Sequence, residues 1–235
     1  MAHTHPVLSQ LLQSNSQWAE AAVWADPDYF KQGVKGQSPK VLWIGCADSR
    51  VPESLVTACK PGDIFVHRNI ANQFHLDDDS AQSVLSYAIT ALGVQHVLVV
   101  GHTHCGGAAA CMSAARTPST APAADTPLGR WLAPLTSIAS SIIEKAPNAP
   151  LDALVEENVR AQVANLSKAP AVQDAWEGGK TMLWIHGLVY KIEDGTLADL
   201  GVSMGPDSEK LYRNETTFFD YVGPLQLVRP VPPPI

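Results

Sequence analysis

The sequence lacks any long apolar segment and any cluster of basic residues. No uninterrupted apolar run approaches the ~20 residues that a membrane-spanning helix needs. The 16 Lys and Arg residues are outnumbered by 23 Asp and Glu residues, and the formal net charge of −7 is spread along the chain. This distribution argues against nucleic acid or an anionic membrane as a partner. Residues 1–6 also lack the charged and apolar regions of a secretory signal, and the first arginine is Arg50, so we expect a cytoplasmic protein.

Cysteine is scarce as well, with only Cys46, Cys59, Cys105 and Cys111 in 235 residues. In a reducing compartment such thiols are more often free or metal ligands than bridged. A chain of this length that is 46% hydrophobic can bury a full core, and no interior linker divides it. We therefore expect a single domain over residues 1–235. A Pro-rich tail at about 228–235 cannot be helical, because each proline removes a backbone donor and fixes φ.

The spacing of apolar residues predicts an α/β fold. Helical spacing over residues 7–30 predicts an N-terminal helical arm of about 5–32. Short apolar strands are predicted at 41–44, 63–66, 96–100 and 182–185. Helices are predicted between them at 54–58, 80–92, 106–113 and 151–166. Such alternation is typical of a mostly parallel β-sheet flanked by helices. In residues 187–202 apolar residues alternate with others, and a turn is expected at Glu193-Asp194-Gly195, which predicts a C-terminal edge hairpin. Residues 113–127 are expected to form a surface loop.

Two clusters of soft metal ligands follow two of these strands. Cys46 opens Cys46-Ala47-Asp48-Ser49-Arg50 after the first strand, and Gly101-His102-Thr103-His104-Cys105 follows the third. Thiolate and imidazole are ligands that zinc prefers, and three protein ligands with an open fourth position are typical of catalytic zinc. Because ligands gather at the carboxyl ends of parallel strands, we assign Cys46, His102 and Cys105 to one zinc ion per subunit. The alternative is a buried core thiol beside a structural clip. His104 is rejected because its side chain should leave the opposite side of the turn.

Taken together, Cys-Ala-Asp-Ser-Arg and His-Thr-His-Cys-Gly-Gly resemble the motifs of β-class carbonic anhydrases. The resemblance continues through residues 36–39, 65–72 and 185–190 and covers about residues 15–205. It implies a zinc lyase that hydrates carbon dioxide reversibly to bicarbonate and a proton, by attack of zinc-bound hydroxide. In this family the helical arm crosses to a partner subunit, and the apolar stripe of the arm needs cover here, so we expect a homodimer or a tetramer.

The resemblance also assigns roles to further residues. Asp48 and Arg50 match the family's catalytic dyad, in which a bidentate Arg keeps the carboxylate ionised and oriented; in a closed state Asp48 would become the fourth zinc ligand. The substrate pocket is expected at Gln37, Phe65, Ile70, Tyr87 and Gly106. A regulatory bicarbonate site is expected at Trp43, Arg68 and Tyr190. For Phe65, Ile70 and Tyr87 the alternative is plain core packing. For the regulatory set the alternatives are packing in the strand core for Trp43, an ion pair with a carboxylate for Arg68, and packing in the hairpin for Tyr190.

Other functions remain in competition with carbon dioxide hydration. Hydrolysis of carbonyl sulfide or carbon disulfide could use the same metal, dyad and pocket. A cysteine phosphatase or sulfurtransferase with Cys46 as nucleophile is disfavoured, because such loops place their arginine farther along the chain and Asp48 would repel an anion. A non-enzymatic zinc-binding module would not need Asp48 and Arg50.

Overall fold

The computed structural model describes residues 5–179 and 182–206, and the chain forms two compact units, residues 1–37 and 38–235. The expected Pro-rich tail lies outside the described residues, and the single domain stays a prediction. The first unit holds α1 (Pro6–Ala25) and α2 (Tyr29–Gly33). The expected arm is helical but not continuous, because Pro27 disfavours helical geometry at Asp26, which is extended with φ −144°. Trp18 joins the two helices, with its ring 5.7 Å from that of Phe30.

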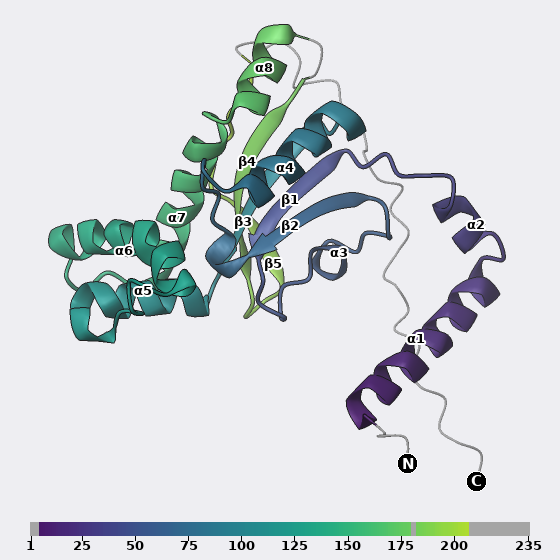
Figure 1. Ribbon diagram of the computed structural model, residues 1–235, viewed down its shortest axis with the longest axis horizontal. Helices are drawn as coiled ribbons and strands as arrows, with labels where there is room; N and C mark the ends of the chain where they lie inside the picture. The colour runs from purple at the N-terminus through teal and green to yellow at the C-terminus, as the bar shows by residue number, and fades with distance from the viewer. Residues whose placement is uncertain (1–4, 180–181, 207–235) are drawn as a thin grey trace. The chain divides into compact units, whose positions relative to one another are not determined.

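The second unit is built on a five-stranded sheet with the order β2-β1-β3-β4-β5 (Figure 1). The strands are β1 (Val41–Cys46), β2 (Ile64–Asn69), β3 (His96–His102), β4 (Trp184–Lys191) and β5 (Thr196–Asp199). The first four are parallel, and β5 pairs with β4 in the antiparallel sense. The expected α/β fold, with a mostly parallel sheet and an edge hairpin, is therefore confirmed.

Helices connect the strands. They are α3 (Glu53–Val56), η1 (Ile70–Asn72), α4 (Asp79–Tyr87), η2 (Ala88–Leu92), α5 (Gly106–Arg116), η3 (Pro118–Thr120), α6 (Pro127–Lys145), α7 (Leu151–Leu166) and α8 (Pro170–Gly178). Helix α7 lies across β3 and β4. Ideal Cβ atoms on Gly101 and Gly187 would lie 2.8 and 2.9 Å from the methyl groups of Val159. The two glycines therefore permit this close packing. No helix of the described residues has the length and hydropathy to cross a membrane.

The two faces of the sheet differ in burial. Under α4 and α7 the side chains are fully buried, among them Leu42, Val99 and Ile185. On the opposite face the side chains of Leu98 and Leu188 are only half-buried. On this second face Trp43 of β1 is nonetheless buried, at 1% exposed, so the face is covered at β1 and only in part over β3 and β4.

Some sequence-based boundaries were wrong. The strand expected at 182–185 begins at Trp184 and continues to Lys191, because its second half also pairs with β3. Residues 113–127 are not all loop, since α5 runs to Arg116 and η3 occupies Pro118–Thr120. Helix α6 was not predicted. It begins with Pro127 in its first turn, and the Thr126 hydroxyl caps it by accepting from the Gly129 N–H at 3.1 Å.

Candidate metal centre

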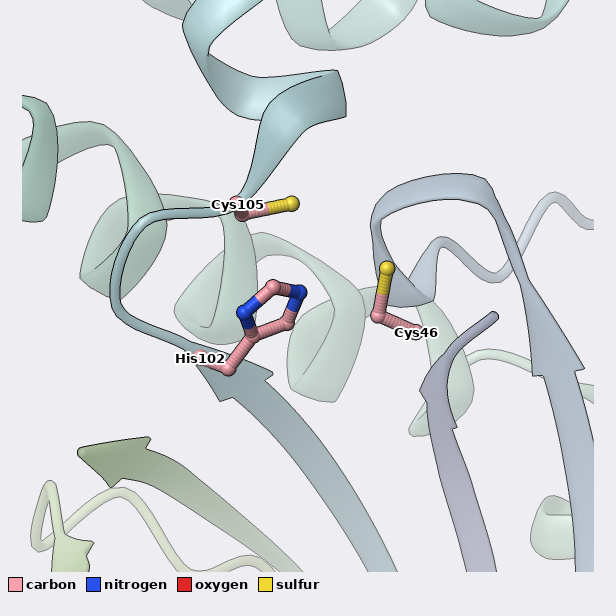
Figure 2. Close-up of side chains that lie close together, drawn as sticks. All are labelled: Cys46, His102 and Cys105. Atoms are coloured by element: carbon pink, nitrogen blue, oxygen red, sulfur yellow. The ribbon is translucent and has the colours of Figure 1, made fainter. Parts of the chain in front are cut away.

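Two cysteines and one histidine converge at the carboxyl edge of the sheet. Cys46 ends β1, His102 ends β3, and Cys105 stands just before α5 (Figure 2). Because β1 and β3 are adjacent and parallel, their last residues reach the same edge. All three side chains are buried, and their ligand atoms lie within 4.8 Å of one another. The structure therefore brings together the three residues assigned to zinc and gives them the geometry of a metal site.

The ring orientation of His102 fits metal binding. Its Nδ1 lies 2.8 Å from the carbonyl oxygen of Thr103, which sets Nδ1 as the donor and leaves Nε2 as the free lone pair. Nε2 is buried and finds no hydrogen-bond partner among the described residues. A backbone carbonyl on the second ring nitrogen is the usual arrangement for a histidine metal ligand. A metal ion bound by the two sulfurs would also satisfy this unpaired nitrogen.

The pKa values of the two thiols are shifted in opposite directions. Hydrogen bonding from Cys105 lowers the pKa of Cys46 to about 4, although burial opposes this shift. The pKa of Cys105 is raised, first by its hydrogen bond to Cys46 and then by burial. Backbone hydrogen bonding from Asp48 and Ala71 also contributes to the lowered pKa of Cys46. Two thiols and one imidazole form a donor set that fits zinc, which displaces thiol protons when it binds.

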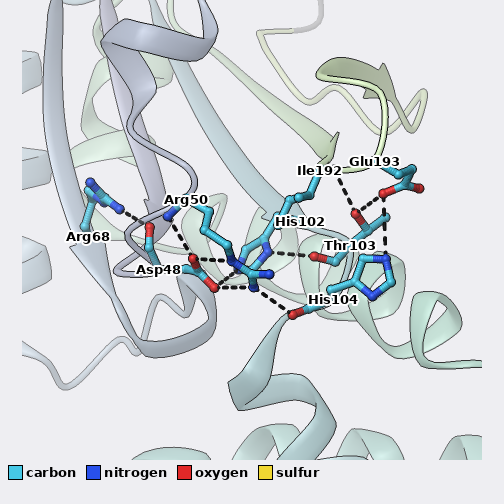
Figure 3. A network of polar contacts seen from close by, with 8 residues as sticks. All are labelled: Asp48, Arg50, Arg68, His102, Thr103, His104, Ile192 and Glu193. Carbon is cyan, nitrogen blue, oxygen red and sulfur yellow. Dashed lines mark hydrogen bonds and ion pairs between the residues drawn. The ribbon is translucent and has the colours of Figure 1, made fainter.

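Asp48 and Arg50 form a bidentate ion pair beside the three ligands. The Arg50 Nε donates to Oδ1 of Asp48 at 3.0 Å, and Nη2 donates to Oδ2 at 2.7 Å (Figure 3). Nη2 also donates to the carbonyl oxygen of His104 at 3.2 Å. The Arg50 guanidinium holds the pKa of Asp48 well below its usual range. Oδ2 of Asp48 lies 3.9 Å from His102 Nε2. Asp48 is thus paired with Arg50 at the border of the site rather than placed as a fourth ligand.

A contact between Thr103 and Glu193 fixes the loop that carries two of the ligands. The Thr103 hydroxyl donates to Oε2 of Glu193 at 2.6 Å and accepts from the Ile192 N–H at 2.9 Å (Figure 3). His104 is exposed, with φ 56°, and its Nε2 lies 3.9 Å from the same carboxylate. His104 therefore faces Glu193, and the turn after β4 anchors the metal-ligand loop. Sequence spacing could not predict this contact, because the two residues are 90 positions apart.

The expected pocket residues fall into separate groups. An ideal Cβ on Gly107 would lie 3.0 Å from Ile70, so Ile70 packs beside the start of α5. The rings of Phe65 and Tyr87 lie 5.9 Å apart, and that of Tyr87 is exposed. Gly106 has open space where a side chain would stand. Gln37 is exposed and belongs to the first unit.

Of the expected regulatory residues, Trp43 and Arg68 lie on the neighbouring strands β1 and β2, whereas Tyr190 lies on β4, with β3 between. Trp43 is buried, and its indole nitrogen occupies the space that a side chain on Gly45 would need. Arg68 Nε donates to the carbonyl oxygen of Cys46 at 2.8 Å, and its Nη2 donates to that of Asp48 at 2.6 Å. Arg68 also lies 3.8 Å from Glu53, the kind of ion pair considered as its alternative role. Tyr190 is aligned with His102 across β3 and β4. A bicarbonate site at these residues stays a prediction.

Fold and site together define an α/β protein with a thiolate and imidazole metal centre beside a carboxylate and guanidinium pair. A family model described as carbonic anhydrase matches residues 41–197. A carbonic anhydrase of Emericella nidulans is 35% identical over 212 residues, which are 86% of this chain and 89% of the relative. The chain belongs to the β-carbonic anhydrase family, as its motifs predicted.

Solved structures agree with this assignment. One of the two β-carbonic anhydrases of Sordaria macrospora described as tetrameric superposes with a TM-score of 0.77 at 32% identity, covering 84% of this chain and 98% of that one. The β-carbonic anhydrase of Coccomyxa, solved with acetazolamide, gives a TM-score of 0.74 at 33% identity, covering 85% and 88%.

Proposed function

We propose that this protein hydrates carbon dioxide reversibly to bicarbonate and a proton, with one zinc ion per subunit held by Cys46, His102 and Cys105. The observation that carries the proposal is the convergence of these buried ligands beside the Asp48–Arg50 pair at one edge of the sheet. When bound, zinc supplies a Lewis acid that acidifies water at its remaining position and so provides a nucleophile near neutral pH.

We infer that Asp48 orients the attacking water. Arg50 donates to both carboxylate oxygens, so the group stays ionised and cannot rotate freely. Oδ2 of Asp48 faces the ligands, 3.9 Å from His102 Nε2, and retains lone pairs that can accept a hydrogen bond from water. The bond from Arg50 to the His104 carbonyl ties the dyad to the ligand loop. Asp48 would thereby hold the water's proton away from carbon dioxide and aim the oxygen lone pair toward it.

The surroundings suit a small apolar substrate that becomes an anion. Ile70 packs beside the start of α5, and Phe65 and Tyr87, whose rings lie 5.9 Å apart, are proposed as a further apolar wall. The N-terminus of α5, beginning at Gly106, presents backbone donors and a partial positive charge that favour the bicarbonate oxygens. Gln37 is proposed as a further donor.

Substrate preference separates the leading function from its nearest rival. We expect kcat/KM for carbon dioxide to exceed ~10⁴ M⁻¹ s⁻¹, the lower end for efficient enzymes, and to exceed that for carbonyl sulfide. Stopped-flow hydration and sulfide release, measured on one preparation of known zinc content, give the two values. Faster turnover of carbonyl sulfide would favour a hydrolase. Turnover of neither substrate by zinc-loaded protein would favour a non-enzymatic module.

We infer self-association as a homodimer or a tetramer. Helix α1 has no buried residue, and Leu8, Leu11, Leu12 and Trp24 are all more than half exposed. Light scattering at micromolar concentration should give at least twice the chain mass. The double change Leu11→Glu/Leu12→Glu should shift the mass toward one chain, because charge disfavours burial of this stripe, whereas Gln13→Glu should not. A stable wild-type monomer would contradict the inference. A cytoplasmic location stays a prediction.

The proposed regulatory site predicts that bicarbonate inhibits by favouring a closed state, in which Asp48 leaves Arg50 and approaches the metal. Arg68→Ala and Tyr190→Phe should each reduce the ratio of hydration rates without and with added bicarbonate. Arg68→Ala also removes two bonds to the ligand loop, so Tyr190→Phe is the cleaner probe. Stopped-flow rates at several bicarbonate concentrations supply the ratio. An unchanged ratio in both variants would contradict a regulatory bicarbonate site at these residues.

A further inference from the structure

Thr103 is a buried polar residue in the loop that carries two of the metal ligands. Its side chain and backbone are 5% exposed, and it directly follows His102 in the sequence. Burying a hydroxyl or a peptide group is unfavourable unless its hydrogen bonds are satisfied. The partners of Thr103 therefore indicate what holds this loop in place.

The partners of Thr103 belong to β4 and to the turn that follows it. The Thr103 N–H donates to the carbonyl oxygen of Tyr190 at 3.0 Å, which continues the pairing of β3 with β4. Its hydroxyl accepts from the Ile192 N–H at 2.9 Å and donates to Oε2 of Glu193 at 2.6 Å (Figure 3). A hydroxyl has a single proton to donate, and here that proton is committed to Glu193. Residues 190–193 thus fix Thr103 through both its backbone and its side chain.

The turn that carries Glu193 has hydrogen bonds of its own. The Gly195 N–H donates to the carbonyl oxygen of Lys191 at 2.8 Å. Oδ1 of Asp194 accepts from the Thr196 N–H at 2.9 Å and from the Thr196 hydroxyl at 2.6 Å. Gly195 has φ 75°, a conformation that glycine adopts without the steric cost of a side chain. The Glu193 side chain is 51% exposed, so the turn rather than surrounding packing sets its position.

Two successive carbonyl groups of the anchored loop serve the metal centre. The Thr103 carbonyl accepts from His102 Nδ1 at 2.8 Å, which leaves Nε2 for the metal. The His104 carbonyl accepts from Arg50 Nη2 at 3.2 Å. His104 has φ 56°, in the left-handed region that residues with a side chain avoid, and such a conformation persists only where the surrounding structure determines it. The positions of both carbonyls therefore depend on how firmly Thr103 is anchored.

We propose that Glu193 is a positioning residue for the metal centre: through the Thr103 hydroxyl it holds the loop whose carbonyls orient His102 and Arg50. Groups of this kind, which hold the partner of a metal-binding histidine, commonly affect metal affinity. The hydrogen bond from Thr103 also lowers the pKa of Glu193, which keeps the carboxylate ionised and the bond charge-assisted. The inference rests on the proposed roles of His102 as a zinc ligand and of Arg50 in the dyad.

The test compares Glu193→Ala with Glu193→Gln. Alanine removes the acceptor, whereas the amide oxygen of glutamine can still accept from the Thr103 hydroxyl. Zinc affinity is measured by competition with a chelator, and hydration by stopped flow on zinc-loaded protein. We expect Glu193→Ala to bind zinc at least ~10-fold more weakly than wild type and to hydrate carbon dioxide more slowly, because outer-shell changes commonly cost 10- to 100-fold. Glu193→Gln should recover most of both losses.

Asp194→Asn is the matched control for charge. It removes one negative charge from the same turn, and its side-chain oxygen can still accept from Thr196. This variant should keep the wild-type zinc affinity and hydration rate.

Thr103 supplies the second half of the test. Thr103→Val removes the hydroxyl with little change of shape and should weaken zinc binding as Glu193→Ala does, whereas Thr103→Ser keeps the hydroxyl and should restore the affinity. The double variant Glu193→Ala/Thr103→Val should lose about as much as the worse single variant, because the two residues act as a unit. If Thr103→Val does not fold, the variants of the half-exposed Glu193 decide.

Three results would overturn the proposal. They are a Glu193→Ala protein with the zinc affinity of Asp194→Asn, equal losses in Glu193→Ala and Glu193→Gln, and losses that multiply fully in the double variant. The second would show that the charge of Glu193 matters rather than the bond that it accepts. Failure of the wild-type protein to bind zinc would instead overturn the proposed function, on which the role of Glu193 depends.

Discussion

Cys46→Ala and Cys105→Ala proteins are expected to lose most of their zinc and more than ~100-fold of their carbon dioxide hydration, since removing a ligand should exceed the 10- to 100-fold cost of an outer-shell change. Both sulfurs face the orphaned His102 Nε2 within 4.8 Å, and two protein ligands are too few for a stable zinc site. Metal analysis of purified protein, together with stopped-flow hydration, measures both losses.

Cys111→Ala is the matched control for this prediction. Cys111 is also buried, but its sulfur lies 3.7 Å from the Leu132 carbonyl oxygen and is not one of the three ligands. This variant should keep one zinc ion per chain. Full zinc retention in Cys46→Ala or Cys105→Ala would remove that residue from the site.

Asp48→Ala and Arg50→Ala should lower hydration together rather than independently. The two side chains share two hydrogen bonds, of 3.0 and 2.7 Å, so loss of either partner dissolves the same arrangement. We expect each single variant to lose at least ~10-fold of kcat/KM and the double variant to lose about as much as the worse single variant, because residues that act as a unit are strongly non-additive.

Arg50→Lys sharpens the comparison. Lysine keeps the charge but cannot form the bidentate pair. If the dyad depends on this geometry, Arg50→Lys should not recover the kcat/KM that Arg50→Ala loses. Zinc content should remain near one per chain in all of these variants. Losses that multiply fully in the double variant would show that Asp48 and Arg50 act separately.

The sequence predicted those parts of the site that depend on residues close to one another along the chain. Cys46 and His102 each follow a continuous apolar run, and this pattern located β1, β3 and the edge where their ends meet. Asp48 and Arg50 are two residues apart, so their pairing needed no knowledge of the fold. Helix α7 was predicted at its observed bounds, because its apolar residues keep helical spacing from Leu151 to Leu166.

Contacts between distant segments could not be predicted in this way. Thr103 and Glu193 are 90 positions apart, and Ala71 and Asn158 are 87 apart. Periodicity shows which side of an element is buried but not which backbone group it meets. A signal for the buried amides of α7 does exist, since Asn158, Gln162 and Asn165, which bind the backbone of residues 71–74, interrupt the apolar side of this helix at helical spacing. For α6, Thr126 before Pro127 is an N-cap followed by a first-turn proline, whereas we read Pro127 as the end of a loop.

Hydration measured during zinc titration of chelator-stripped protein tests the central claim most directly. Stopped-flow rates should start near the uncatalysed value, rise in proportion to zinc added, and level off at one zinc ion per chain. In Cys105→Ala the same titration should give no rise. Hydration that is independent of bound zinc, or absent when one zinc ion is bound per chain, would contradict the assignment of Cys46, His102 and Cys105 as the catalytic metal centre.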